Sequence, residues 1–251
     1  VDTYRRVQPD LVMLGDDNAL RLVGPRLAGT GTPLVYFGIN NNPRDYQITS
    51  FENMTGVLER PLAKRSIVYL SELIKPWPKR ILILFDSGVT SQAAVREMFS
   101  DRFCVRVGGV QVDLKLIVRL ADWKEAVLTA KKRGYGAIVV GLYHTIVDQD
   151  GNHVPAPDIL DWTSRNTPVP PFGFWSFAVG RDRTVGGLVL FGETQGEAAA
   201  RIARQILAGV NPSEIRPVVG KKGRFYFSRS QLKKWDLVLP PDIAAKADMT
   251  D

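Results

Sequence analysis

Four short apolar runs along the chain each give way to polar residues at the point where a strand would end. The runs occupy residues 11–14, 34–37, 81–84 and 138–140. A strand that is buried on both faces of a parallel sheet is apolar throughout, without alternation. Because open α/β sheets bind ligands outside the carboxyl ends of their strands, we expect the polar residues after these runs to line a ligand site.

Strands and helices are predicted to alternate along most of the chain. The predicted strands cover residues 11–15, 34–39, 81–86, 105–112, 137–142, 171–175 and 187–192. The clearest helix spans 123–133, with Asp122 as its cap, Glu125 completing a capping box and Gly134 ending it. Further helices are predicted over 61–74, from near Gln92, and before Gly209. This alternation favours a doubly wound, mainly parallel α/β sheet.

The length and composition of the chain allow either one large domain or two lobes. It has 251 residues, of which 45% are hydrophobic, enough for two cores of about 100 to 130 residues each. The alternation of strands and helices is interrupted twice, at residues 53–57, which have no adjacent apolar strand, and at residues 168–171. We interpret both segments as joints between lobes. No apolar stretch approaches the roughly 20 residues of a membrane helix, and Val1 begins neither a signal peptide nor a start codon.

Five segments carry a resemblance, in order along nearly the whole chain: residues 33–38, 53–57, 80–87, 187–192 and 195–209. The closing segment, 225–243, belongs with them. Together they resemble ABC-transporter substrate-binding proteins, a family that includes tryptophan-type binding proteins. The resemblance implies a periplasmic-binding-protein fold of type I, in which two α/β lobes, joined by three crossing segments, close on a small molecule. It implies one lobe from residues 1–57 and 186–211 and another from 58–185 and 212–251. The family's first strand-helix-strand unit is absent from lobe one, so either the chain is truncated or that lobe is incomplete.

The candidate site residues of lobe one follow its first two strands. Asp16, Asp17 and Asn18 precede a helix, and one of them is expected to cap it while another faces the cleft. Asn40 and Asn41 form a turn that the family places at the rim of lobe one. We therefore predict ligand contacts from these two loops, and the acidic pair could equally hold an amine.

The candidate site residues of lobe two also follow strands. Asp86, Ser87, Thr90 and Ser91 precede a helix, where N–H and hydroxyl groups bind a carboxylate readily; the alternative is that Thr90 or Ser91 only caps the helix. Three more candidates follow the strand at 137: Tyr143, His144 and Thr145. A catalytic His144 would need a partner, and none is evident, so ligand contact and a structural role both stay open. Within the aromatic run 172–177, packing is the default, and Trp175 is predicted as an aromatic wall of the site.

The residue types exclude some chemistry. One cysteine and two distant histidines cannot build a closed zinc site. The segment from Asp148 begins like a calcium loop but has His153 at the sixth position, where glycine is needed, and Ile159 at the twelfth, where glutamate is needed. No metal or cofactor is therefore expected. The dinucleotide fingerprint, the phosphate loop and the nucleophile elbow are also missing, which disfavours an enzyme. The net charge of +7 and the basic segment 201–234 come without a nucleic-acid module, so no nucleic-acid partner is expected.

These observations favour a non-enzymatic solute-binding protein outside the cytoplasm, in the periplasm or at the cell surface. It would capture a small polar ligand, an amino acid among the candidates, by hinge closure and deliver it as a monomer to an ABC transporter permease in the membrane. One alternative is the extracytoplasmic sensing domain of a signalling receptor. A doubly wound enzyme is the third hypothesis, and the identity of the ligand cannot be read from the sequence.

Overall fold

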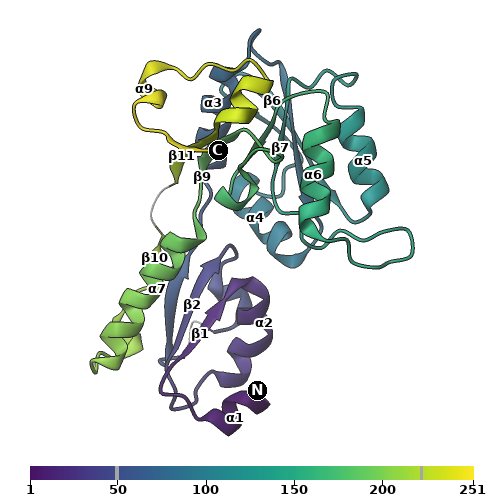
Figure 1. The fold of residues 1–251 in the computed structure, drawn as a ribbon. Helices are drawn as coiled ribbons and strands as arrows, with labels where there is room; N and C mark the ends of the chain where they lie inside the picture. Colours follow the sequence, from purple (N-terminus) through teal and green to yellow (C-terminus); the bar gives the residue numbers. More distant parts are fainter. Residues whose placement is uncertain (49–50, 221–222) are drawn as a thin grey trace. The chain divides into compact units, whose positions relative to one another are not determined.

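The computed structural model describes residues 1–48, 51–220 and 223–251, and the chain forms two compact units (Figure 1). We call Val1–Arg60 with Gly192–Lys221 lobe one, and Pro61–Phe191 with Lys222–Asp251 lobe two. The chain thus passes between the lobes three times. The passages follow residues 60, 191 and 221. The boundaries expected from the sequence follow residues 57, 185 and 211, so each observed passage comes later in the chain. The third comes later because residues 218 and 219 still pair with a strand of lobe one.

Lobe one is built on a parallel sheet with one helix on each face. The strands follow the order β1, β2, β3, β10, with bounds Val12–Gly15, Leu34–Ile39, Met54–Leu58 and Val218–Val219. On β2, Leu34 and Tyr36 belong to the core beneath α2 (Asp16–Leu27), whereas Val35 packs with α7 (Gly192–Leu207). The shorter elements are α1 (Asp2–Val7), η1 (Pro43–Tyr46) and η3 (Pro212–Glu214). Burial on both faces explains why β2 is an apolar run.

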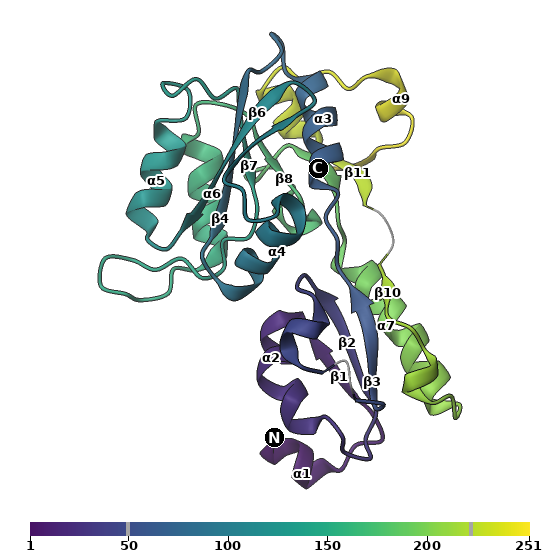
Figure 2. The ribbon, with the colours of Figure 1, turned by 180° about the vertical axis from the view of Figure 1, so that it is seen from behind.

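Lobe two contains a five-stranded sheet that is parallel except for one edge strand. Its order is β5, β6, β4, β7, β8, with bounds Cys104–Val107, Val110–Ile117, Arg80–Asp86, Ala137–Val140 and Pro171–Gly173. Ile83 and Phe85 of β4 pack with α3 (Ala63–Leu73) and α4 (Val89–Phe99). Leu82 and Leu84 pack with α5 (Leu120–Leu128) and α6 (Ala156–Asn166), on the opposite face (Figure 2). The predicted α/β class with mainly parallel sheets is confirmed.

A smaller sheet completes lobe two. Its strands are β12 (Asp248–Thr250), β11 (Arg224–Ser228) and β9 (Gly186–Val189), and β11 runs antiparallel to β9. The remaining helices of this lobe are η2 (Ser176–Ala178), α8 (Arg229–Lys234) and α9 (Pro241–Ala244). Over the described ranges, no helix combines the length and apolar character that crossing a bilayer would require.

Three local predictions are wrong. The single strand expected over 105–112 is a hairpin, because Gly108 and Gly109 both take positive φ (55° and 84°), which the tight turn between β5 and β6 requires. Helix α5 begins after Arg119 without a side-chain cap, and Glu125 pairs instead with Arg133 at 2.8 Å. Helix α4 starts at Val89, so neither Thr90 nor Ser91 is its N-cap.

Neither predicted joint is a crossing between the lobes. Residues 54–57 belong to β3, a strand of the lobe-one sheet that pairs with both β2 and β10. Residues 168–171 lie inside lobe two and lead into β8. The glycine at position 56 hid β3, whose pairing is set by tertiary contacts.

Candidate ligand-binding site

A buried carboxylate organises the carboxyl edge of the lobe-one sheet. Asp17, in the first turn of α2, is fully buried and accepts hydrogen bonds from the backbone N–H groups of Asn40 (2.9 Å) and Asn41 (3.0 Å) and from the Tyr46 hydroxyl (2.8 Å). Burial raises the pKa of Asp17 above its ordinary value, although these hydrogen bonds oppose the rise. The first turn of α2 is therefore tied to the end of β2.

The two neighbours of Asp17 are exposed at the start of α2. Asp16 has φ of 74° and accepts a hydrogen bond from the backbone N–H of Asn18 at 3.4 Å. Gly15 is the N-cap of the helix, and no side chain caps it, so the expectation that one of these three residues is the cap is wrong. Their contact with a ligand stays a prediction.

Asn40 and Asn41 are buried and carry unpaired acceptors. The two residues are 3% and 7% exposed, and the side-chain amide of Asn40 donates to Glu59 Oε2 at 3.2 Å. Among the described residues, Asn40 Oδ1 and Asn41 Oδ1 have no hydrogen-bond partner. A buried acceptor without a donor costs roughly 1 to 3 kcal/mol. These two oxygens are accordingly positions at which a ligand N–H or O–H group would be favourable.

Two residues that the sequence analysis missed complete this edge. Glu59 is buried directly after β3, and Arg60 Nη1 donates to the carbonyl oxygens of Ile39 (2.9 Å) and Asn40 (2.8 Å). The rule that selected Asn40 and Asn41, polar residues after a strand, also selects Glu59 and Arg60 once β3 is known to be a strand.

Asp86 plays the corresponding part at the carboxyl edge of the lobe-two sheet. It is buried at the end of β4, and its Oδ1 accepts hydrogen bonds from the backbone N–H of Gly88 (3.0 Å) and from the Ser91 hydroxyl. Its Oδ2 accepts a hydrogen bond from the backbone N–H of Thr145 at 2.9 Å. Of the predicted residues here, Asp86, Ser91 and Thr145 are therefore brought together, and Ser87 and Thr90 lie partly buried beside them.

An aromatic cluster lies beside this edge in lobe two. The ring of Tyr143 stacks on His144 with centroids 4.7 Å apart, and Phe177 meets His144 edge-on at 5.3 Å. Trp175 stacks on Phe177 at 6.2 Å and meets Phe85 edge-on at 6.2 Å. His144 and Phe177 are the exposed members, whereas Tyr143 and Trp175 are buried.

This cluster is suited to contact an apolar or aromatic group, and its tyrosine is not an acid at neutral pH. Burial raises the pKa of Tyr143 to about 12, so its hydroxyl stays protonated at neutral pH. Trp175 fills the core between Phe85 and Phe177, and Phe177, which the sequence analysis did not single out, carries the accessible ring. Within the described part of the chain, no group of three or more histidine, cysteine or acidic side chains is placed to hold a metal ion.

Comparison with known proteins identifies the fold. No protein-family model matches the sequence, and no curated protein matches it. The structure is similar to the ABC domain in complex with L-Trp from Streptococcus pneumonia, with a TM-score of 0.72 and 16% identity over 98% of this chain and 80% of that chain. It is also similar to a conserved domain protein from Vibrio cholerae (TM-score 0.71, 14% identity, covering 99% of this chain and 81% of that chain).

A third similar structure is the ligand-free, open form of a substrate-binding protein with adhesive properties from Clostridium difficile. Its TM-score is 0.64 at 14% identity, over 99% of this chain and 81% of that chain. At such identities the likeness concerns the fold alone. The chain is thus an α/β protein with mainly parallel sheets whose structure matches periplasmic-binding-protein folds, including those of ABC-transporter substrate-binding proteins.

Proposed function

We propose that this protein is an extracytoplasmic solute-binding protein of an ABC transporter, with the type I periplasmic-binding-protein fold. It holds a small polar ligand between its lobes by hinge closure and delivers it, as a monomer, to the permease. The fold similarity and the three passages of the chain between the lobes support this function. The observation that carries it is the pair of buried, unpaired amide oxygens of Asn40 and Asn41.

The chemistry of the two edges suggests what the ligand contains. In lobe one, two amide oxygens beside the carboxylates of Asp17 and Glu59 would favour a ligand with N–H donors, such as an ammonium group. In lobe two, the exposed rings of His144 and Phe177 suit an apolar or aromatic part. An amino acid with an apolar side chain has both, and L-Trp is the ligand in one of the similar structures.

A thermal-shift screen tests the proposal. The panel contains amino acids, L-Trp included, with nucleobases, sugars and small acids. A ligand at 100 times its Kd should stabilise the chain by about 2.7 kcal/mol. We expect at least one amine-bearing compound to raise the melting temperature. If no compound in the panel does so, the proposal is wrong.

Matched variants then locate the bound compound. Asn41→Ala removes the unpaired side-chain oxygen. The backbone N–H of residue 41 still donates its hydrogen bond to Asp17, so we expect the loop to keep its conformation. We expect it to weaken binding at least tenfold by calorimetry, about 1.4 kcal/mol. Asn166→Ala, at the exposed end of α6, should leave the affinity unchanged. Equal affinities for both variants would exclude Asn41 from the site.

A further inference from the structure

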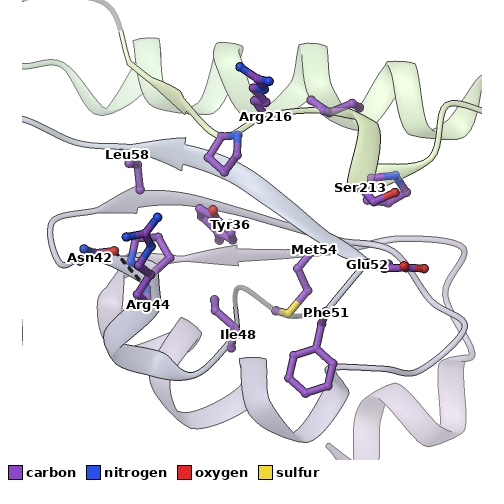
Figure 3. A pocket seen from close by; sticks show the side chains of 14 residues that line it. Tyr36, Asn42, Arg44, Ile48, Phe51, Glu52, Met54, Leu58, Ser213 and Arg216 are labelled. Carbon is purple, nitrogen blue, oxygen red and sulfur yellow. Dashed lines mark hydrogen bonds between the residues drawn. The ribbon is translucent and has the colours of Figure 1, made fainter.

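A cavity of about 510 Å³ opens within lobe one, on the face of the sheet that carries α2 (Figure 3). Tyr36 of β2 with Met54 and Leu58 of β3 form its floor. Ile48 and Ile215, the latter from the segment that leads into β10, also line it. Its volume falls in the range of roughly 300 to 1,000 Å³ that is common for small-molecule sites. Asp17, Asn40 and Asn41 do not line it.

The sequence of β3 explains how the floor of the cavity is built. Residues 54, 56 and 58 share one face of the strand, and the middle one is Gly56. A Cβ at Gly56 would lie 2.0 Å from the carbonyl oxygen of Tyr36, so no side chain can stand there. Such a Cβ would also lie 2.4 Å from Cδ2 of the Tyr36 ring, so this ring takes the place of a side chain between Met54 and Leu58.

Tyr36, at the floor of the cavity, carries a hydroxyl that can donate a hydrogen bond. Tyr36 is only 3% exposed, and no hydrogen bond to its hydroxyl is found among the residues that the structure describes. Burial raises its pKa to about 12, so the hydroxyl remains a donor at neutral pH. An acceptor atom bound in the cavity would therefore take a hydrogen bond from this hydroxyl.

The rim of the cavity supplies positive charge near one end. Arg44 and Arg216 line it, and neither forms an ion pair within residues 1–48, 51–220 and 223–251. Figure 3 shows Arg44 and Glu52 at opposite ends of the cavity, so the one acidic lining residue is remote from Arg44. Guanidinium groups bind carboxylates through paired, charge-assisted hydrogen bonds.

We propose that this cavity is a second ligand site, contained in lobe one, for a small carboxylic acid with an apolar body. The carboxylate accepts from the Tyr36 hydroxyl and from Arg44, and the apolar body packs against Ile48, Met54 and Ile215. The site is distinct from the proposed solute site, because Asp17, Asn40, Asn41 and Glu59 do not line it.

Methionine methyl signals provide a direct test. The chain has four methionines, Met13, Met54, Met98 and Met249, of which Met54 alone lines this cavity. The full chain, labelled with ¹³C at the methionine methyl groups, is titrated with octanoate, and the Met54→Leu variant assigns its signal. We expect the Met54 signal to move saturably while the other three stay in place. An unmoved Met54 signal, or equal movement of all four, would overturn the proposal.

Charge and side-chain variants separate this site from general hydrophobic binding. Neutral octanamide should bind at least tenfold more weakly than octanoate, and Tyr36→Phe and Arg44→Gln should each weaken octanoate binding about fivefold or more. Arg21→Gln, on the exposed face of α2, is the matched control and should have no effect. Equal binding of octanoate and octanamide, or an unchanged affinity in Arg44→Gln, would refute the carboxylate assignment. In Asn41→Ala, octanoate should still move the Met54 signal. The cavity proposal can therefore hold even if the solute-binding proposal fails.

Discussion

The carboxylate of Asp17 accepts a hydrogen bond from the backbone N–H of Asn40 at 2.9 Å, which joins the start of α2 to the end of β2. In lobe two, Asp86 makes the equivalent link to the backbone of Thr145. Each lobe thus uses one buried aspartate to fix the loops that follow two neighbouring strands. Because the ligand contacts proposed above stand on these loops, both aspartates should matter for stability before any ligand is added.

Removing the lobe-one carboxylate should therefore destabilise the protein. Asp17→Ala leaves two buried N–H groups and the Tyr46 hydroxyl without their acceptor, and we expect the free energy of unfolding in urea to fall by about 3 kcal/mol. Asn18→Ala, on the exposed side of the same turn, should change it by less than about 0.5 kcal/mol. A loss below 1 kcal/mol in Asp17→Ala would contradict the role given to this carboxylate.

Two glycine substitutions should act in opposite directions. Gly56→Ala would place a Cβ 2.0 Å from a backbone oxygen that cannot move without breaking the pairing of β2 and β3, so a loss of at least about 3 kcal/mol is expected. Gly196→Ala, inside α7 with open space around it, should stabilise the protein by about 1 kcal/mol. Thermal unfolding of both variants measures these changes. If Gly56→Ala were as stable as the parent chain, the close approach of β3 to the carbonyl oxygen of Tyr36 would be disproved.

The pH dependence of the free energy of unfolding should show how much the ionised carboxylate of Asp113 stabilises the fold. Burial acts to raise the pKa of Asp113, but hydrogen bonds from Gln111, Arg80, Cys104 and Tyr135 outweigh it and hold the pKa below its ordinary value. An acid with a lowered pKa in the folded state stabilises the fold above the unfolded value near 3.9, and this contribution is lost as the pH falls through the folded value. Asp113→Asn should therefore cost about 1 kcal/mol at pH 7, since Arg80 is partly exposed.

This penalty should disappear when the pH is lowered below the folded pKa. Urea unfolding of Asp113→Asn and the parent chain from pH 7 down to about pH 2 covers the range in which the contribution of Asp113 should be lost. Asp101→Asn is the control, because its pair with Arg96 is exposed on both sides and should matter little at any pH. A penalty for Asp113→Asn that grew as the pH fell would reverse the assigned sign.

The sequence predicted those parts of the fold that burial on both faces makes apolar. The strand over 34–39 matches β2, and 81–86 lies within β4 (Arg80–Asp86). It missed β3, whose Gly56 interrupts the apolar pattern and whose pairing depends on Tyr36, and with β3 it missed Glu59 and Arg60. The local sequence pattern does not show that a segment containing a glycine will pair with a neighbouring strand.

Side-chain roles were harder to predict than strand ends. The loops that carry Asn40 and Asp86 follow strands as expected, but the fully buried state of Asp17 comes from three donors on another segment. Trp175 was singled out for its aromatic ring, and the packing of Phe85 against it could not be read from the sequence. Burial of a given side chain depends on contacts between distant segments, which spacing along the chain does not encode.

The radius of gyration of the full chain in solution tests the central claim most directly. Small-angle X-ray scattering should be recorded with and without a saturating amount of the compound that gives the largest thermal shift. If two lobes close on a ligand, the radius of gyration should decrease on binding and stay at the ligand-free value in Asn41→Ala under conditions where that variant does not bind. A radius of gyration that is the same with and without saturating ligand would contradict the account.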